Sequence, residues 1–253
     1  MFIPLSDDNS DRRIRPLVNL SLIAVNLLVF FFLQGVGSNL QFTYSLSTVP
    51  QEILTGHDIV TAERIVRDPA TGERFRVPGL GKTPLSVYLT LLTSMFMHGG
   101  LMHLLGNMLY LHIFGDNIEN LMGHRRYLGF YLLCGVLASL AHVFTSAALN
   151  ADLLVPSLGA SGAISGVLGA YFLLFPKRRV RVLVFRFITE VPALVAIGVW
   201  FAFQLISSLG MLGGGPGDGV AYGAHIGGFI AGLVLVKFFL IGRYEGKARR
   251  LPH

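Results

Sequence analysis

Four polar residues that could act together in a chemical reaction stand in three separate apolar stretches of this chain. Ser161 opens one stretch, His225 lies near the start of another, and His103 and Asn107 lie four residues apart in a third. A serine hydroxyl is a weak nucleophile, and a neutral imidazole within hydrogen-bond reach can take its proton. Ser161 and His225 are therefore a candidate nucleophile and base for acyl transfer.

A reaction of this kind also needs donors for the negative charge that develops on the substrate oxygen. His103 and Asn107 share one face of a helix because they are four residues apart. Ser161 is predicted to lie in the first turn of its helix, where backbone N–H groups have no acceptor within the helix. These three donors are a candidate oxyanion hole, in which losing one donor typically costs about 10²–10³ in rate.

Helix packing is the alternative explanation for the same residues. Gly162 and Gly166 are four apart, as are Gly228 and Gly232, and small residues at this spacing let membrane helices approach closely. Ser161 and His225 would then serve only as hydrogen-bonding groups between helices. The same close approach, however, is what would bring Ser161 and His225 into contact, so the glycines fit both explanations.

The composition indicates an integral membrane protein. Of 253 residues, 53% are hydrophobic and 13% are charged, whereas soluble domains average about 25% charged residues. The net charge of +6 does not indicate nucleic-acid binding, because the basic residues lie between apolar stretches. The single cysteine, Cys134, excludes an intrachain disulfide.

We predict an all-α fold, a six-span bundle occupying residues 17–241, between an N-terminal tail (1–16) and a basic C-terminal tail (242–253). A membrane span needs about 20 mostly apolar residues. The candidate spans are Leu17–Leu33, Leu101–Ile118, Tyr127–Leu149, Ala160–Phe175, Val191–Leu212 and Tyr222–Ile241. The long first loop, residues 34–100, contains a predicted β-hairpin at Arg64–Val77 and an interfacial or re-entrant stretch at Pro84–Met97.

The distribution of Lys and Arg predicts the orientation. Both tails and the 2–3 and 4–5 loops hold 14 of the 20 basic residues, so both termini are expected in the cytoplasm. Spans two, four and six then begin at the outer face, which places Ser161, His225, His103 and Asn107 at one depth. This shared depth favours a common function, because polar residues inside a membrane are costly and usually functional.

Other membrane chemistries fit less well. There is no H-E-x-x-H motif, so no metal site is predicted. Asp116 is the only Asp within a span, which excludes a pair of catalytic aspartates. The sequence around Ser161 is G-x-S-G rather than G-x-S-x-G, so a hydrolase nucleophile elbow is a poor fit.

With these residues assembled, the chain resembles the rhomboid family of intramembrane serine proteases. Three motifs carry the resemblance: H-x4-H-x3-N from His98 through His103 to Asn107, Gly159-Ala160-Ser161-Gly162, and Ala224-His225-x-x-Gly228-x-x-x-Gly232. Their order on spans two, four and six is specific. Ser165 stands four residues after Ser161, where some members have an aromatic residue; Tyr171 and Tyr222 are the alternative ring partners for His225.

The resemblance implies a Ser161–His225 dyad without an acidic third member, with an oxyanion hole from Ser161 N–H, His103 and Asn107. It implies supporting roles for His98, Gly159, Gly162, Gly228 and Gly232, and no cofactor. The implied substrates are single-span membrane proteins in the bilayer, cut near the outer face after a small residue. The expected location is the plasma (bacterial inner) membrane.

Two other functions stay open at this stage. A non-catalytic relative would bind or escort single-span partners, although such proteins usually lack the serine or the histidine. A small transporter could use the short fourth span as a broken-helix site, although no internal repeat is evident. The first-loop insertion, about residues 56–82, is expected to contact a substrate or partner outside the membrane.

Overall fold

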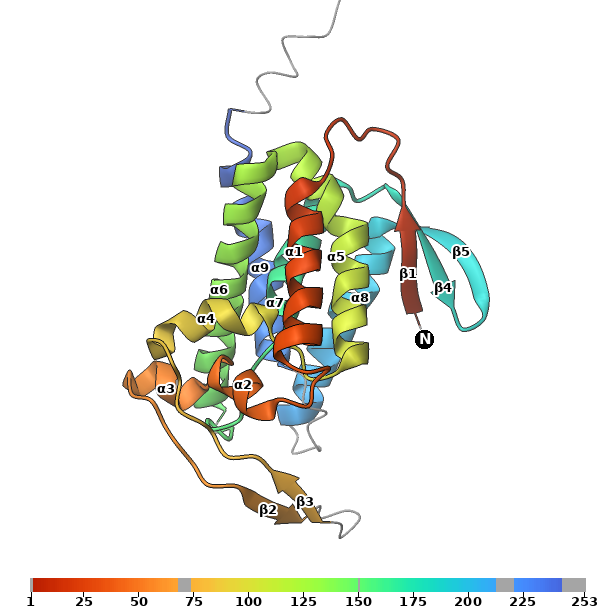
Figure 1. Ribbon diagram of the computed structural model, residues 1–253. Helices are drawn as coiled ribbons and strands as arrows, with labels where there is room; N and C mark the ends of the chain where they lie inside the picture. Colours follow the sequence, from red (N-terminus) through yellow and green to blue (C-terminus); the bar gives the residue numbers. More distant parts are fainter. Residues whose placement is uncertain (1, 68–73, 150, 213–220, 243–253) are drawn as a thin grey trace, which may run out of the picture.

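The computed structural model describes residues 2–67, 74–149, 151–212 and 221–242, and its centre is a bundle of six long helical segments (Figure 1). Each predicted span corresponds to one segment. They are α1 (Leu17–Leu28) continued by a π-helical turn (Val29–Leu33), α5 (Leu101–Met122), α6 (His124–Ala148), α7 (Ser161–Leu174), α8 (Ala193–Leu212) and α9 (Tyr222–Phe239).

Helix length and composition support membrane insertion only in part. Among the described residues, α6 and α9 are long and apolar enough to cross a membrane by these criteria, while α1 with its π-helical turn and α7 are shorter apolar helices. The all-α prediction holds for the bundle, and the count of six spans remains a prediction.

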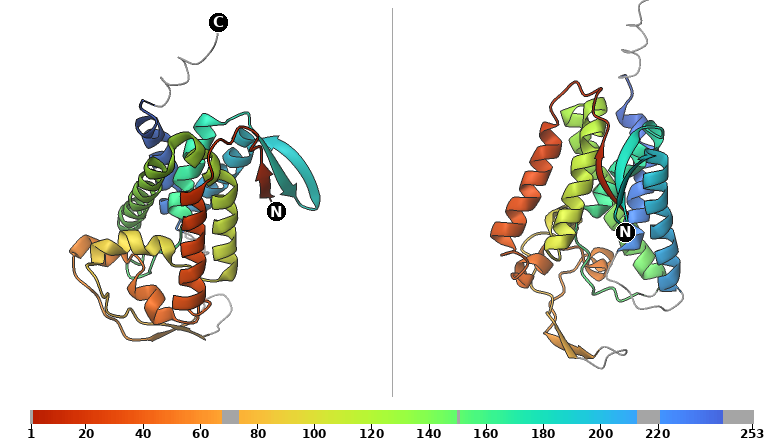
Figure 2. Two further views of the ribbon diagram at one scale, coloured as in Figure 1. Left: turned by 45° about the horizontal axis from the view of Figure 1, so that its top comes forward. Right: turned by 90° about the vertical axis from the view of Figure 1, so that its right-hand side faces the viewer.

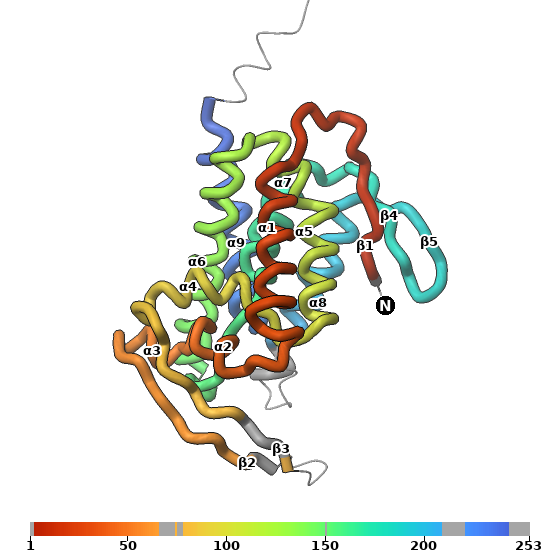
Figure 3. Tube along the Cα trace, in the orientation of Figure 1, coloured from red at the N-terminus to blue at the C-terminus, as the bar shows by residue number. Residues whose placement is uncertain are grey.

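The short helix α7 lies at the centre of the bundle, in contact with α5, α6, α8 and α9 (Figure 3). Every residue from Gly162 to Tyr171 is buried. Its closest neighbour is α9, where a Cβ on Gly228 would lie 2.1 Å from the Gly162 carbonyl oxygen and one on Gly232 would lie 2.0 Å from that of Gly166. The two backbones therefore touch, and only glycine fits at these positions of α9.

The first loop packs at the end of the bundle where α7 begins. It contains α2 (Leu40–Ser45), α3 (Pro50–Thr55), a 3₁₀ turn (Val87–Leu89), α4 (Thr90–Thr93) and a second 3₁₀ turn (Ser94–Phe96). The predicted hairpin is confirmed as β2 (Arg64–Arg67) paired antiparallel with β3 (Arg74–Val77). Its predicted turn, residues 68–73, lies outside the described residues.

A three-stranded antiparallel sheet that lies beside the bundle was not predicted (Figure 1). The strand β1 (Phe2–Asp7) pairs with β4 (Arg179–Val184), which pairs with β5 (Phe187–Pro192). The N-terminal tail and the 4–5 loop were expected only as basic segments between or beside spans, but they pair with each other in this sheet. The reason is visible in β4, where Val180 and Val182 are buried and the alternating Arg179 and Arg181 are exposed.

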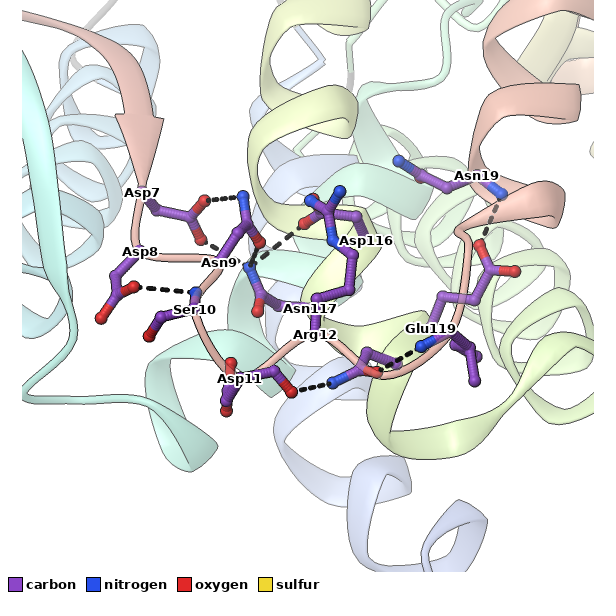
Figure 4. Close-up of polar contacts among 12 residues, drawn as sticks. Asp7, Asp8, Asn9, Ser10, Asp11, Arg12, Asn19, Asp116, Asn117 and Glu119 are labelled. Carbon is purple, nitrogen blue, oxygen red and sulfur yellow. Dashed lines mark hydrogen bonds and ion pairs between the residues drawn. The ribbon is translucent and has the colours of Figure 1, made fainter.

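Polar side chains fasten the N-terminal tail to the end of α5 (Figure 4). Arg12 forms an ion pair with Asp116, and Asn117 Nδ2 donates to Asp7 Oδ2 at 2.7 Å. Glu119 accepts the backbone N–H groups of Val18 and Asn19 at 2.9 and 2.7 Å. Because helix N-termini have N–H groups without partners in the helix, Glu119 caps the start of α1 from a neighbouring helix.

Candidate active site

Ser161 is the first residue of α7, and the preceding turn fixes its direction. Gly159 has φ +122°, a backbone conformation that L side chains rarely adopt. A Cβ at Gly159 would also lie 2.8 Å from His103 Nε2. Glycine at this position therefore permits both the turn into α7 and the approach of His103 to that turn.

The structure brings Ser161 and His225 together from α7 and the first turn of α9. Ser161 Oγ lies 2.8 Å from His225 Nε2, within hydrogen-bond distance. The contact depends on the glycine packing described above, since Gly162 follows Ser161 and Gly228 lies one turn after His225. The predicted juxtaposition of nucleophile and base is present.

A third residue, Gln204 on α8, contacts the far side of the imidazole. Gln204 Oε1 lies 2.8 Å from His225 Nδ1, and the Gln204 side chain is buried. An amide oxygen can only accept, so this contact requires the proton of a neutral imidazole to be on Nδ1. The lone pair on Nε2 is then directed at the Ser161 hydroxyl. The sequence interpretation did not include Gln204.

Aromatic rings from other positions lie beside His225, because the residue four positions after Ser161 is a serine and has no ring. The ring centroids of Trp200 and Tyr222 lie 6.0 and 6.4 Å from that of His225. Ser165 instead donates to the Ser161 carbonyl oxygen at 2.6 Å, within the helix. Of the two tyrosines considered, Tyr222 is therefore beside the imidazole, whereas Tyr171 bonds Asp7 at the opposite end of α7.

The expected oxyanion donors both lie on α5, and their side chains differ in their contacts. His103 reaches the Gly159 turn, as noted above. The Asn107 side chain, by contrast, donates through Nδ2 to the His103 carbonyl oxygen at 2.9 Å, one turn back on its own helix. This bond uses one of the two Nδ2 hydrogens, so the other can donate to an oxyanion.

His98 lies behind His103, as a bracing residue would. It is fully buried, and its ring meets that of His103 edge to face with centroids 5.2 Å apart. The Gln34 side chain holds the His98 backbone, accepting its N–H at 3.0 Å and donating to its carbonyl at 2.9 Å. Burial lowers the pKa of His98 to about 3, so this imidazole stays neutral.

A small cavity adjoins the serine. Its volume is about 20 Å³, and Ser94, Ser139, Gly159 and Ser161 are among the residues that line it. A cavity of this size has room for about one water molecule, and the hydroxyl groups supply hydrogen-bond partners. The site thus combines a nucleophile, a base, a polar cavity and neighbouring donors, the components of acyl transfer.

This bundle and its serine–histidine pair define a class of protein, and sequence comparison identifies it. Residues 86–242 match the model of the Rhomboid domain, and the chain belongs to the rhomboid family, whose members are integral to membranes. It is 31% identical over 170 residues to Rhomboid protein 1, mitochondrial, of Saccharomyces cerevisiae. That match covers 67% of this chain and 45% of the yeast protein.

Two further relatives show the breadth of the family. The chain is 35% identical over 148 residues to the rhomboid protease GluP of Bacillus subtilis, covering 57% of this chain and 25% of that protein. It is 28% identical over 174 residues to the human presenilin-associated rhomboid-like protein, mitochondrial, covering 65% and 44%. The matched region thus spans less than half the length of these relatives. Two of the three are mitochondrial by name, which does not fit the expected bacterial plasma membrane.

Proposed function

We propose that this protein is an intramembrane serine endopeptidase that cleaves single-span membrane proteins. One observation carries the proposal: the 2.8 Å contact between Ser161 Oγ and His225 Nε2, with Gln204 holding the other imidazole nitrogen. A serine and a histidine that merely joined two helices would need neither the third contact nor the neighbouring donors. The family includes proteases, as the name of the Bacillus relative states.

Acylation follows from this geometry. The Ser161 hydroxyl donates its proton to His225 Nε2 as its oxygen attacks the substrate carbonyl carbon. The carbonyl π electrons move to oxygen, and that oxyanion accepts hydrogen bonds from the Ser161 N–H, His103 and Asn107. Collapse of the tetrahedral intermediate breaks the C–N bond, and the imidazolium donates its proton to the departing amine.

Deacylation repeats these roles with water. A water molecule in the cavity beside Ser161 attacks the acyl-enzyme while His225 Nε2 accepts its proton. The second intermediate collapses by breaking the C–O bond to Ser161, and the imidazolium returns its proton to Oγ, which releases the carboxyl fragment and restores the Ser161 hydroxyl. Side chains alone supply every proton transfer, so the proposal includes no cofactor.

We further propose the orientation that the basic residues favour. The end of the bundle where α1 begins and α9 ends then faces the cytoplasm or the equivalent side of another membrane. The Ser161 end faces the opposite side. Substrates are then cut at or near that outer face, and the β2–β3 hairpin of the insertion is placed to meet substrate or a partner outside the membrane.

Cleavage of a generic single-span substrate in proteoliposomes tests the function. Ser161→Ala and His225→Ala should abolish cleavage, and a fluorophosphonate should label Ser161 in the unmodified protein. Ser165→Ala is the matched control, because that hydroxyl bonds only within its helix, and it should stay active and labelled. Cleavage that persists in folded Ser161→Ala protein would refute the mechanism. Substrate binding without cleavage or label would favour the escort function instead.

A further inference from the structure

The β4–β5 hairpin exposes large apolar side chains at its tip. Phe185 is 79% exposed, Phe187 70% and Ile188 64%, and all three lie within four consecutive residues. The transfer of apolar side chains of this size from water into an apolar environment is favourable. A cluster of them at the end of a projecting hairpin marks a surface that something covers.

The turn itself shows that an aromatic side chain is retained there at a conformational cost. Val184 pairs with Phe187, so the loop has two residues, and Phe185 occupies its first position with φ +55°. Two-residue hairpin loops with a positive φ at the first position normally have glycine there. A bulky side chain in the left-handed region is strained. Because the Phe185 side chain is 79% exposed, burial within the fold offsets little of this strain.

The same hairpin is strongly basic. Arg179, Arg181 and Arg186 lie on it, and its one acid, Glu190, is 3.7 Å from Arg181 in an exposed pair. An open recess of about 370 Å³ at its base is lined by Asp8 and residues 174–179, where Lys177 and Arg179 add positive charge and Arg178 pairs with Asp11 at 2.7 Å. Exposed aromatic rings beside clustered Lys and Arg are the chemistry of a membrane interface with anionic lipids.

The position of the sheet fits that interface. Both β4 and β5 contact α8, and β1 contacts α5. The sheet lies beside the helices rather than beyond their ends (Figures 1 and 2). Lipid surrounds the bundle of an integral membrane protein, so the hairpin meets the bilayer. The outer edge of β5 carries unpaired backbone groups, which hydrocarbon does not tolerate. The base of the hairpin therefore belongs among the headgroups, and the tip, which points along the bundle away from that end, lies deeper, at the acyl boundary (Figures 1 and 2).

We propose that the β4–β5 hairpin binds anionic phospholipids in the leaflet at the basic end of the bundle. The arginines and the basic recess bind the headgroup phosphates, and Phe185, Phe187 and Ile188 enter the acyl boundary. A second copy of the chain is a poor occupant, because a symmetric contact would bring the same basic residues together. This inference depends on membrane insertion and not on proteolysis.

A tryptophan reporter on the hairpin tests the proposal. Trp200 is the only tryptophan of the chain, so the Trp200→Phe/Phe187→Trp variant has a single indole at the tip. The full chain is placed in two kinds of phosphatidylcholine nanodisc. One contains brominated phosphatidylglycerol and the other the same amount of brominated phosphatidylcholine. Bromine quenches indole fluorescence on contact, so quenching shows which lipid lies at the tip. Ser161→Ala is added in one series, so that the result is independent of catalysis.

We expect bromines near the headgroup to quench more than bromines deep in the chain, and phosphatidylglycerol to quench more than phosphatidylcholine. Replacing Arg179, Arg181 and Arg186 by Gln should remove the preference for phosphatidylglycerol. Each substitution is expected to lower binding of phosphatidylglycerol relative to phosphatidylcholine by about fivefold. The matched control replaces three basic residues at the same end of the bundle, Arg13, Arg15 and Arg125, by Gln, and should keep the preference.

Two results would overturn the proposal. One is an indole that no brominated lipid quenches. An indole that is shielded only in nanodiscs holding two copies of the chain counts as this result, because a second copy and not lipid would then cover the tip. The other is equal quenching by both lipids that neither set of arginine substitutions changes. Loss of the headgroup preference in the hairpin variant alone, at unchanged helix content by circular dichroism, would support it.

Discussion

Adding one methyl group at Gly228 tests how far catalysis depends on the contact between α7 and α9. The new Cβ would lie 2.1 Å from the Gly162 carbonyl oxygen, where real Cβ atoms stay beyond 3.0 Å. That oxygen belongs to the backbone of the buried part of α7, so it cannot rotate aside. The two helices must therefore separate by roughly 1 Å at this point.

The displacement acts directly on the serine–histidine contact. Gly162 adjoins Ser161, and His225 lies less than one turn before Gly228, so the 2.8 Å separation of Oγ and Nε2 grows by a similar amount. Hydrogen bonds weaken beyond about 3.2 Å, and a 1 Å misplacement of reacting groups can cost about 10²-fold in rate. We expect Gly228→Ala to lower kcat/KM by about 10- to 100-fold.

The assay is cleavage of a single-span substrate in proteoliposomes, with thermal unfolding measured in parallel. Gly129→Ala on α6 is the matched control, because its Cβ would meet only Phe239 at 3.5 Å, an ordinary contact. The control should retain activity and gain a little stability, since Ala is favoured over Gly in helices by about 0.5–1 kcal/mol. A folded Gly228→Ala protein with activity within twofold of the unmodified protein would refute the reasoning.

Three further predictions concern single side chains. Gln204→Leu removes the amide acceptor that Gln204 offers to His225 Nδ1, so kcat should fall about 5- to 150-fold while KM stays unchanged, and single-turnover kinetics would separate the two. Asn107→Ala should lower kcat by about 10²–10³ without unfolding the protein, and an unchanged kcat would remove Asn107 from the oxyanion hole. Burial raises the pKa of Asp7 from 3.8 to about 7. The folded tail then holds this proton more tightly than the unfolded chain does, so its docking is strongest below pH 3.8 and weakens as pH rises through about 7. Amide exchange in β1, corrected for intrinsic rates, should show this loss, and Asp7→Asn should abolish the pH dependence.

The residues that meet at the site were largely predictable because each lies in a short local motif. Ser161 opens a helix after a glycine turn, His225 lies in the first turn of another, and His103 and Asn107 share a helix face. Gln204 was missed because it is a single polar residue within an apolar run, with no partner at a telling spacing. The signal that could have found it is the cost of an amide inside a membrane helix.

The helices were predictable for a similar reason, whereas the three-stranded sheet was not. A helix is specified by residues that are consecutive in the sequence, so a continuous apolar stretch indicates it. The strand β1, by contrast, pairs with β4 far along the chain, as Phe2 does with Val184. No local pattern specifies such a partner. The alternation of arginine and valine in β4 was visible, yet a basic connection between spans also accounts for arginines, and that explanation was preferred.

The amide of Gln204 determines the electrostatic state of the resting site. With the proton of His225 on Nδ1, the serine, imidazole and amide carry no formal charge, whereas a carboxylate at this position would bring a permanent ion into a medium where bare ions are costly. In the proposed reaction, charge appears only transiently, as an imidazolium next to an oxyanion. Each of these ions loses hydration in a medium of low dielectric constant, and their mutual attraction offsets part of that cost because they form side by side. A neutral resting site therefore avoids the cost of a permanently buried ion.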